Sequence, residues 1–254
     1  MKKLRILIAL VCIGILNTSC SSDSANATSD VASFEGSETG QSGSLARFVI
    51  LDDYLYTVDF QSLNVFSIVN TENPVLVNTI NVGFNIETLS SYKEYLYIGS
   101  RNGMFIYDAS QSETPQLLSA VQHFTACDPV IATSSHAFVT LKGGNLCGEN
   151  LNVLEVYDVT NAENPILISQ RNMVGPVGMG FYQNKYLFVC DDQVKIFDIS
   201  DPENMQLVHA IDADSFDVII QNNLLILIGE TGLTQYMLDP ENILNESFLS
   251  ALSL

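Results

Sequence analysis

The sequence repeats with a period of about forty residues from Leu45 onward, and this repeat limits the possible folds more than any other feature. An aromatic residue stands at the centre of an apolar run in four units, and an isoleucine takes its place in the fifth. These residues are Tyr56, Tyr97, Phe138, Phe188 and Ile226, at spacings of 41, 41, 50 and 38. Self-similarity at a fixed period is typical of architectures built from copies of one supersecondary unit.

A second marker repeats independently of the first. It is a four-residue turn with Glu at its second position, Asn at the third position in four copies and Pro at the fourth position in three. The turns begin at Thr71, Ser112, Ala162, Pro202 and Pro240, at steps of 41, 50, 40 and 38. Because the two markers agree, we count five units.

Each unit contains short apolar runs rich in Val, Ile, Tyr and Phe, which turn residues separate. The second unit shows four such runs, at Ile86–Leu89, Tyr95–Gly99, Met104–Tyr107 and Gln116–Val121. Four strands per forty residues predict an all-β fold, a five-bladed β-propeller of four-stranded antiparallel blades. A six-bladed propeller and a β-sandwich are the alternatives, but a sandwich gives no reason for the turn to repeat.

The third run of each unit, with its turn, resembles the LVIVD repeat family. The motif is clearest at Leu154–Asn161, Met104–Asp108 and Val194–Ser200, while Leu63–Ser67 has Ser for Asp and Leu233–Met237 fits loosely. The resemblance covers Leu45 to Leu254. It implies an exported bacterial β-propeller, often a lipoprotein, and it implies little about activity.

Side-chain alternation gives the motif a physical meaning, because a propeller sheet is buried on both faces. We expect Leu154, Val156 and Val159 to face one adjoining blade, and Tyr157 to face the other. We interpret Asp158 and its equivalents as turn-capping residues, since Asp commonly accepts backbone N–H bonds in turns.

Residues 1–19 are typical of an export signal. Lys2, Lys3 and Arg5 precede the apolar run Ile6–Leu16, which is too short to span a bilayer. The run closes on Cys20, in a pattern that resembles a bacterial lipobox. We therefore predict acylation of Cys20 and anchoring to a membrane of the cell envelope, either the outer membrane or the cell surface.

Residues 20–44 predict a disordered tether between the lipidated cysteine and a propeller at residues 45–254. The segment is rich in Ser, Gly and acids and has few large apolar side chains, so it cannot bury enough surface to fold.

The formal net charge of −19 argues against nucleic acid as a partner, because 29 Asp and Glu face only 10 Lys and Arg.

Three cysteines remain after the signal and the anchor. Cys127 precedes the first run of the third unit, and Cys147 lies in the insertion 142–150 that makes this unit long. Both positions fall at one end of one blade, so we predict a disulfide between them, worth about 3 kcal/mol in an oxidising compartment. Two unrelated thiols are the alternative. Cys190 follows an apolar run and is interpreted as a buried small hydrophobe.

The first run of each unit begins at the mouth of the predicted channel. The aligned positions there are Ala46, Glu87, Asp128, Gly178 and Asp217. We interpret the three carboxylates as a solvated acidic rim and expect no cofactor. Their convergence would also permit a Ca²⁺ ion or a cationic ligand.

No catalytic motif stands out, and the three histidines share no spacing, so each is interpreted as structural or exposed. The sequence therefore predicts a lipid-anchored, non-catalytic binding or scaffolding module for a protein or carbohydrate partner. The alternative is an exported glycan hydrolase or lyase that uses Glu87, Asp128 or Asp217 as acid and base.

Overall fold

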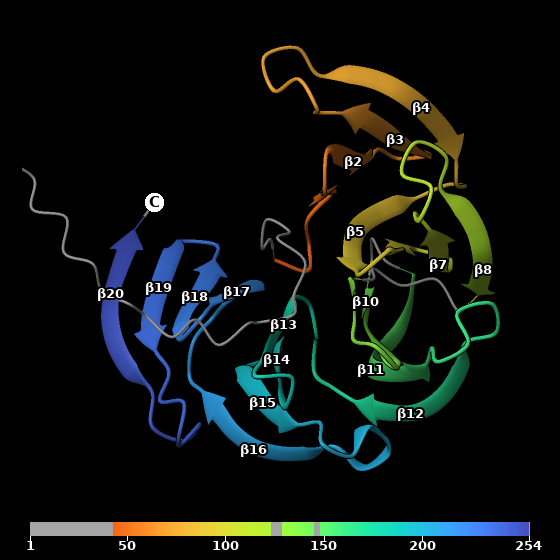
Figure 1. Cartoon of the computed structure of the whole chain (residues 1–254). Coiled ribbons are helices and arrows are strands. Elements are labelled where there is room, and N and C mark those ends of the chain that lie inside the picture. The colour runs from red at the N-terminus through yellow and green to blue at the C-terminus, as the bar shows by residue number, and fades with distance from the viewer. Residues whose placement is uncertain (1–42, 123–128, 145–147, 254) are drawn as a thin grey trace, which may run out of the picture. The chain divides into compact units, whose positions relative to one another are not determined.

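The computed structural model describes residues 43–122, 129–144 and 148–253, all within the compact unit Gly36–Leu254. Twenty strands and one short 3₁₀ helix, η1 (Pro202–Asn204), make up the secondary structure of these residues. The strands form five four-stranded antiparallel sheets, and each sheet consists of four consecutive strands. Figure 1 shows the sheets following one another about a common axis in the order of the chain. The predicted all-β, five-bladed propeller is confirmed.

The strand bounds follow the repeat. Blade 1 contains β1 (Phe48–Leu51), β2 (Tyr54–Val58), β3 (Ser62–Ser67) and β4 (Val75–Asn81). Blade 2 contains β5 (Ile86–Tyr92), β6 (Tyr95–Ser100), β7 (Gly103–Asp108) and β8 (Gln116–Gln122). Blade 3 contains β9 (Val130–Ala132), β10 (His136–Gly144), β11 (Gly148–Asp158) and β12 (Ile166–Asn172). Blade 4 contains β13 (Met179–Tyr182), β14 (Tyr186–Cys190), β15 (Val194–Asp198) and β16 (Gln206–Ile211). Blade 5 contains β17 (Asp217–Gln221), β18 (Leu224–Gly229), β19 (Gly232–Met237) and β20 (Ser247–Ser253).

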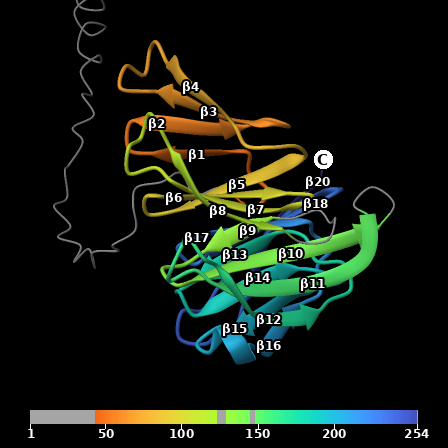
Figure 2. The ribbon, with the colours of Figure 1, turned by 90° about the vertical axis from the view of Figure 1, so that its right-hand side faces the viewer.

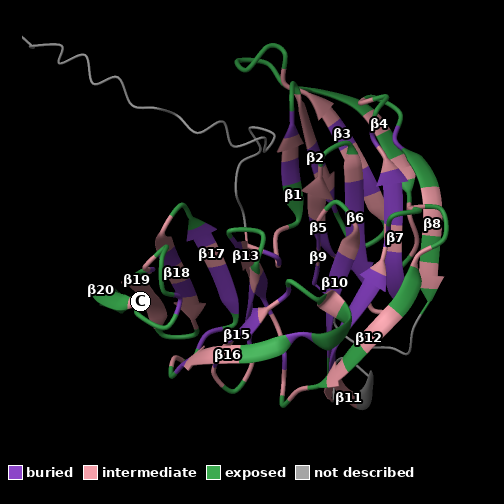
Figure 3. Ribbon diagram, turned by 60° about the horizontal axis from the view of Figure 1, so that its bottom comes forward, coloured by how far each residue is buried: buried purple, intermediate pink, exposed green. Residues whose placement is uncertain are grey.

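Buried apolar clusters fill the spaces between successive blades, because every inner sheet has a neighbour on both faces. One cluster lies between each of the pairs 1 and 2, 2 and 3, 3 and 4, and 4 and 5. The repeated aromatic residues Tyr56, Tyr97, Phe138 and Phe188 are at most 2% exposed. The fourth strand of each blade is the outermost and the most exposed, as Figure 3 shows.

The faces of the third blade correct one expectation. Leu154 and Val156 pack toward blade 4, as a shared face requires. Val159 packs with Tyr157 toward blade 2, so its predicted face is wrong. Val159 lies three positions after Val156. Because side chains alternate between the two faces of a strand, residues an odd number of positions apart lie on opposite faces.

The motif aspartates cap the turns that follow the third strands, as predicted. Asp108, Asp158 and Asp198 each accept the backbone N–H group two residues further on, at 2.7 to 2.9 Å. Asp158 also accepts the hydroxyl group of Thr160 at 2.6 Å. These hydrogen bonds to the charged form lower the pKa of Asp158.

The insertion of the third unit lengthens a hairpin. β10 and β11 continue their pairing to Lys142 with Asn152 and, after a register shift, to Gly144 with Gly148. Figure 2 shows this hairpin reaching past the neighbouring strands. Cys127 and Cys147 lie outside the described residues, so the predicted disulfide stays a prediction.

The side between blade 5 and blade 1 differs from the other four. Within residues 43–122, 129–144 and 148–253, no buried apolar cluster joins these two blades. Leu55 of blade 1 and Ile226 of blade 5 are partly exposed, whereas the equivalent Leu96 and Tyr97 of blade 2 are buried. A link across this side must therefore use other contacts.

We expect Phe138→Ala to lower the free energy of unfolding by about 3 to 5 kcal/mol, because the ring is fully buried between blades 3 and 4. It also makes an edge-to-face contact with Phe181, at 5.4 Å between ring centroids. Urea denaturation followed by circular dichroism measures the loss. Phe60→Ala is the control, since Phe60 is 55% exposed. Equal losses in the two variants would contradict the packing described above.

Candidate functional site

The first strands of blades 1 to 4 begin around one small cavity of about 230 Å³. Its walls come from all four blades and consist of Leu45, Arg47, Glu87, Thr88, Pro129, Lys142, Pro176 and Val177. The predicted convergence of strand starts on a common mouth is therefore visible in the structure. Glu87 lies on the wall, whereas Asp217 does not, and Asp128 falls outside the described residues.

Asp217 is a buried anchor for the segment that enters blade 1. Its side chain accepts hydrogen bonds from the backbone N–H groups of Ser44, Leu45 and Val218 and from the hydroxyl group of Ser44. The same Ser44 hydroxyl oxygen accepts the backbone N–H group of Met179 at 2.7 Å. Asp217 thus connects the first described residues to the start of blade 5, on the side without an apolar cluster. Ser44 belongs to the packed body, although the predicted tether extends to this residue.

The other two rim positions, Ala46 and Gly178, act through their backbones. The carbonyl oxygen of Ala46 accepts the N–H group of Leu89, and the N–H group of Gly178 donates to the carbonyl oxygen of Phe216. A Cβ atom on Gly178 would lie 2.5 Å from Oδ1 of Asp217. A glycine is therefore required here because the carboxylate comes so close.

Asp217 should make the protein less stable as the pH rises toward neutral. Burial raises its pKa from 3.8 to about 6. The folded state therefore holds the proton more tightly than the unfolded state, and this stabilisation is complete below about pH 4 and lost as the pH rises through 6. Two pKa units correspond to about 3 kcal/mol. Urea unfolding of the protein and of Asp217→Asn between pH 4 and 7.5 measures the effect.

The expected result is a smaller decrease in stability with rising pH for Asp217→Asn than for the unmodified protein. Asp53→Asn is the control, because Asp53 is exposed and should leave the pH profile unchanged. A profile that Asp217→Asn does not alter would show that this carboxyl does not titrate with a raised pKa.

Glu87 is paired with a cation. Its Oε1 accepts a hydrogen bond from Nε of Arg101 at 2.7 Å, and its backbone carbonyl oxygen accepts one from Nε of Arg47 at 3.0 Å. Within the described part of the chain, no three His, Cys, Asp or Glu residues gather into a metal site. Because Asp128 is not described, the Ca²⁺ hypothesis is not tested.

Cys190 is buried, and burial raises the pKa of its thiol to about 12. Nε2 of His209 donates a hydrogen bond to the carboxylate of Glu246 at 2.9 Å. Neither residue lines this cavity. Within the described residues, no helix is long and apolar enough to cross a membrane.

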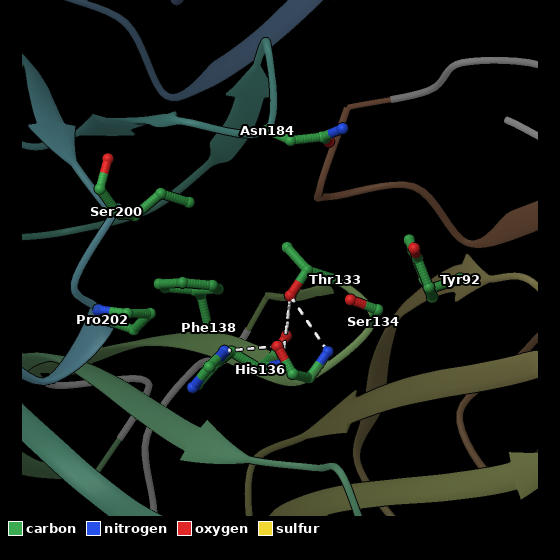
Figure 4. Close-up of a pocket in the computed structure, with 10 residues that line it drawn as sticks. Tyr92, Thr133, Ser134, His136, Phe138, Asn184, Ser200 and Pro202 are labelled. Atoms are coloured by element: carbon green, nitrogen blue, oxygen red, sulfur yellow. Dashed lines mark hydrogen bonds between the residues drawn. The ribbon is translucent and has the colours of Figure 1, made fainter. Parts of the chain in front are cut away.

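A second, larger cavity lies at the opposite ends of the same inner strands. Glu87 and Thr88 at the start of β5 line the first cavity, whereas Tyr92 at its end lines the second. The second cavity has a volume of about 330 Å³. Its walls are Tyr92, Thr133, Ser134, Ser135, His136, Phe138, Asn184, Ile199, Ser200 and Pro202, most of which Figure 4 labels.

The turn between β9 and β10 forms the polar wall of this cavity. Thr133 Oγ1 accepts the backbone N–H groups of Ser135 and His136, and the Ser135 hydroxyl group lies 2.9 Å from Nδ1 of His136. Figure 4 shows these bonds as dashed lines where both partners are drawn. The turn is thus fixed by its own side chains, and the second nitrogen of the His136 ring is not used by them.

Several polar groups on these walls have no hydrogen-bond partner among the residues that the structure describes. They are the hydroxyl groups of Ser134 and Tyr92, the side-chain amide of Asn184, and Nε2 of His136. No described residue on the cavity wall carries a carboxylate or a Lys or Arg side chain. The cavity offers neutral donors and acceptors beside an aromatic ring.

Sequence reasoning did not find this cavity. The run Thr133-Ser134-Ser135-His136 was visible as a hydroxyl-rich turn, but turns are polar in most proteins. Only the curvature of the propeller brings Asn184 from the next blade and Tyr92 from the preceding blade to the same space.

Comparisons with known proteins agree with this fold. Residues 183–213, which run from the first turn of blade 4 to its last strand, match the LVIVD repeat family. No curated protein matches the chain.

Solved structures with a similar fold have little sequence identity to the chain. A functionally unknown protein from Desulfotomaculum acetoxidans has a TM-score of 0.66 at 10% identity, over 87% of this chain and 71% of that one. A protein from Lactobacillus plantarum has a TM-score of 0.65 at 11% identity, over 86% and 72%. A periplasmic gluconolactonase from Pseudomonas aeruginosa has a TM-score of 0.60 at 12% identity, over 82% and 68%. At such identities the likeness shows the fold alone. The chain is a five-bladed β-propeller whose fourth blade carries an LVIVD repeat, the family that its third-strand motif resembles.

Proposed function

We propose that this chain is a lipid-anchored, non-catalytic binding module of the cell envelope, and that its ligand is a neutral carbohydrate. The observation that carries the proposal is the composition of the larger cavity. Its walls present hydroxyl, amide and imidazole groups next to Tyr92, with no charged side chain among the described residues. Sugars are recognised by such directional hydrogen bonds together with an aromatic surface.

The same composition favours binding over hydrolysis. Glycoside hydrolysis generally requires two carboxylates about 5 to 9 Å apart across the scissile bond. Among the described residues, the wall of the larger cavity holds no carboxylate, and the wall of the smaller cavity holds one, Glu87, which is paired with Arg101. A gluconolactonase shares the fold at 12% identity, and a likeness of this kind carries no activity.

Asn184→Gly should weaken carbohydrate binding about tenfold, because it removes an amide that can both donate to and accept from a sugar. Glycine suits the positive φ of 51° at this residue, so the turn is retained. The probes are maltotriose, cellotriose and chitotriose, and the measurement is isothermal titration calorimetry. Ser134→Ala tests the neighbouring hydroxyl group in the same way.

Asn222→Gly is the matched control, since Asn222 has a φ of 54° in the equivalent turn of blade 5 and does not line the cavity. This variant should bind as the unmodified protein does. Absence of binding to all three sugars, or equal losses in Asn184→Gly and Asn222→Gly, would refute the carbohydrate proposal. Shortened sugars in mass spectra of the mixtures would refute the non-catalytic part.

Anchoring rests on the N-terminal sequence. We expect Cys20→Ala to move the protein from the membrane fraction to the soluble fraction, because the acylated thiol would supply the apolar chains that hold it. Fractionation of cells followed by immunoblotting measures the distribution. Cys12→Ala, within the predicted signal, is the control and should leave the protein bound. Retention of Cys20→Ala on membranes would show that another feature holds the protein there.

A further inference from the structure

The smaller cavity gathers positive charge in a strongly acidic protein. The chain has 10 Lys and Arg residues, of which three lie in the predicted signal peptide. Arg47, Arg101 and Lys142 lie at or beside the mouth formed by the strand starts. The predicted acidic rim therefore carries two cations, Arg47 and Lys142, among its described residues. Its carboxylate there, that of Glu87, forms an ion pair with a third cation, Arg101.

Most other cations of the propeller have structural partners. Lys185 and Lys195 form ion pairs with aspartates, and Arg171 lies over the ring of Phe197 at 5.1 Å. Arg101 pairs with Glu87. These side chains already have partners within the blades or turns.

Arg47 and Lys142 differ from this group. Among the described residues, neither side chain has a carboxylate partner, and Arg47 uses only Nε, in its bond to the carbonyl oxygen of Glu87. The two terminal guanidinium nitrogens of Arg47 and the ammonium group of Lys142 keep their donors. Two cations on one cavity wall with no carboxylate partner among the described residues are a feature that an anion can use.

The backbone holds both residues in place. The carbonyl oxygen of Arg47 accepts the N–H group of Val58, and Lys142 is paired with Asn152 in the β10–β11 ladder. The Asn152 side chain also joins Gly143 to the carbonyl oxygen of Val174, just before the wall residues Pro176 and Val177. The cations therefore extend from a braced frame, and positioned donors lose less freedom on binding than mobile ones.

The remaining walls are apolar. Leu45, Pro129, Pro176 and Val177 supply apolar surface beside Arg47 and Lys142, whose own side chains are exposed to solvent. The volume of about 230 Å³ is below the range typical of drug-sized ligands, so it suits a small one.

We propose that this mouth binds a small oxyanion, a carboxylate or phosphate group, between Arg47 and Lys142. Arg47 would contact two of its oxygens through the planar guanidinium group, and Lys142 would neutralise it from blade 3. The site is separate from the carbohydrate cavity, because the two lie at opposite ends of β5 and β9.

Calorimetric titration of the purified protein with sodium glucuronate and with inorganic phosphate tests the proposal. Methyl glucoside, which lacks the charge, is the neutral probe. We expect at least one anion to bind and Lys142→Gln and Arg47→Gln each to weaken that binding about tenfold, the usual worth of one charge-assisted hydrogen bond. Binding of glucuronate alone identifies a carboxylate site, and binding of phosphate alone identifies a phosphate site.

Lys93→Gln is the charge-matched control, since Lys93 is exposed in the turn after β5, at the opposite end of the strand. It should leave anion binding unchanged. Backbone amide shifts of Thr88 and Val177 in NMR spectra should follow the same titration. Failure of both anions to bind, or equal losses in Lys93→Gln and Lys142→Gln, would overturn the proposal without affecting the carbohydrate assignment.

Discussion

Every sheet of this protein must be covered on both faces, and the rest of the structure follows from that requirement. Apolar side chains occupy both faces of the inner strands, so a single sheet would expose one face to water at about 25 cal/mol per Å². Placing sheets side by side around an axis solves the problem for four interfaces, each with its own cluster. The same arrangement brings the ends of the innermost strands together, and both cavities include residues at those ends.

The requirement is not met in the same way between blades 5 and 1. The other four sides each have an apolar cluster. Between blades 5 and 1, the described residues instead form hydrogen bonds to a buried carboxylate, that of Asp217. Asp217 binds the segment around Ser44 through directional contacts, and its desolvation raises its pKa and limits what these contacts contribute at neutral pH. A polar link also positions the chain accurately, because each N–H group must meet a fixed oxygen. Arg47 follows this segment closely, so the link helps to place the mouth of the propeller.

The repeat made the fold predictable, and side-chain partners made the site hard to predict. Periodicity alone predicted five blades, and it predicted the strand bounds of blade 2 to within three residues of those in the structure. It could do so because each unit repeats the same pattern of strands and turns. The predicted face of Val159 was wrong because Val159 and Val156, three positions apart, were placed on the same face of the sheet. Glu87 and Asp217 were aligned correctly but interpreted by charge alone. Their partners, Arg101 and the Ser44 segment, come from other positions in the repeat, where local patterns carry no information about them.

The two cavities show how one repeated framework can recognise two kinds of chemistry. Strand starts are joined to the preceding blade by connecting segments, and two of these carry the wall residues Pro129 and Pro176. Of the two cations, Arg47 immediately precedes β1 and Lys142 lies in β10. Strand ends lead into tight turns, where Ser, Thr and Asn are favoured because they bond to nearby backbone groups. Once such a turn is satisfied internally, its remaining hydroxyl and amide groups are left to line the larger cavity. The neutral lining of the larger cavity thus comes from turn residues, whereas Arg47 and Lys142 keep donors that the described residues do not use. Donors that the described residues leave unused are the ones for which a ligand is the better explanation.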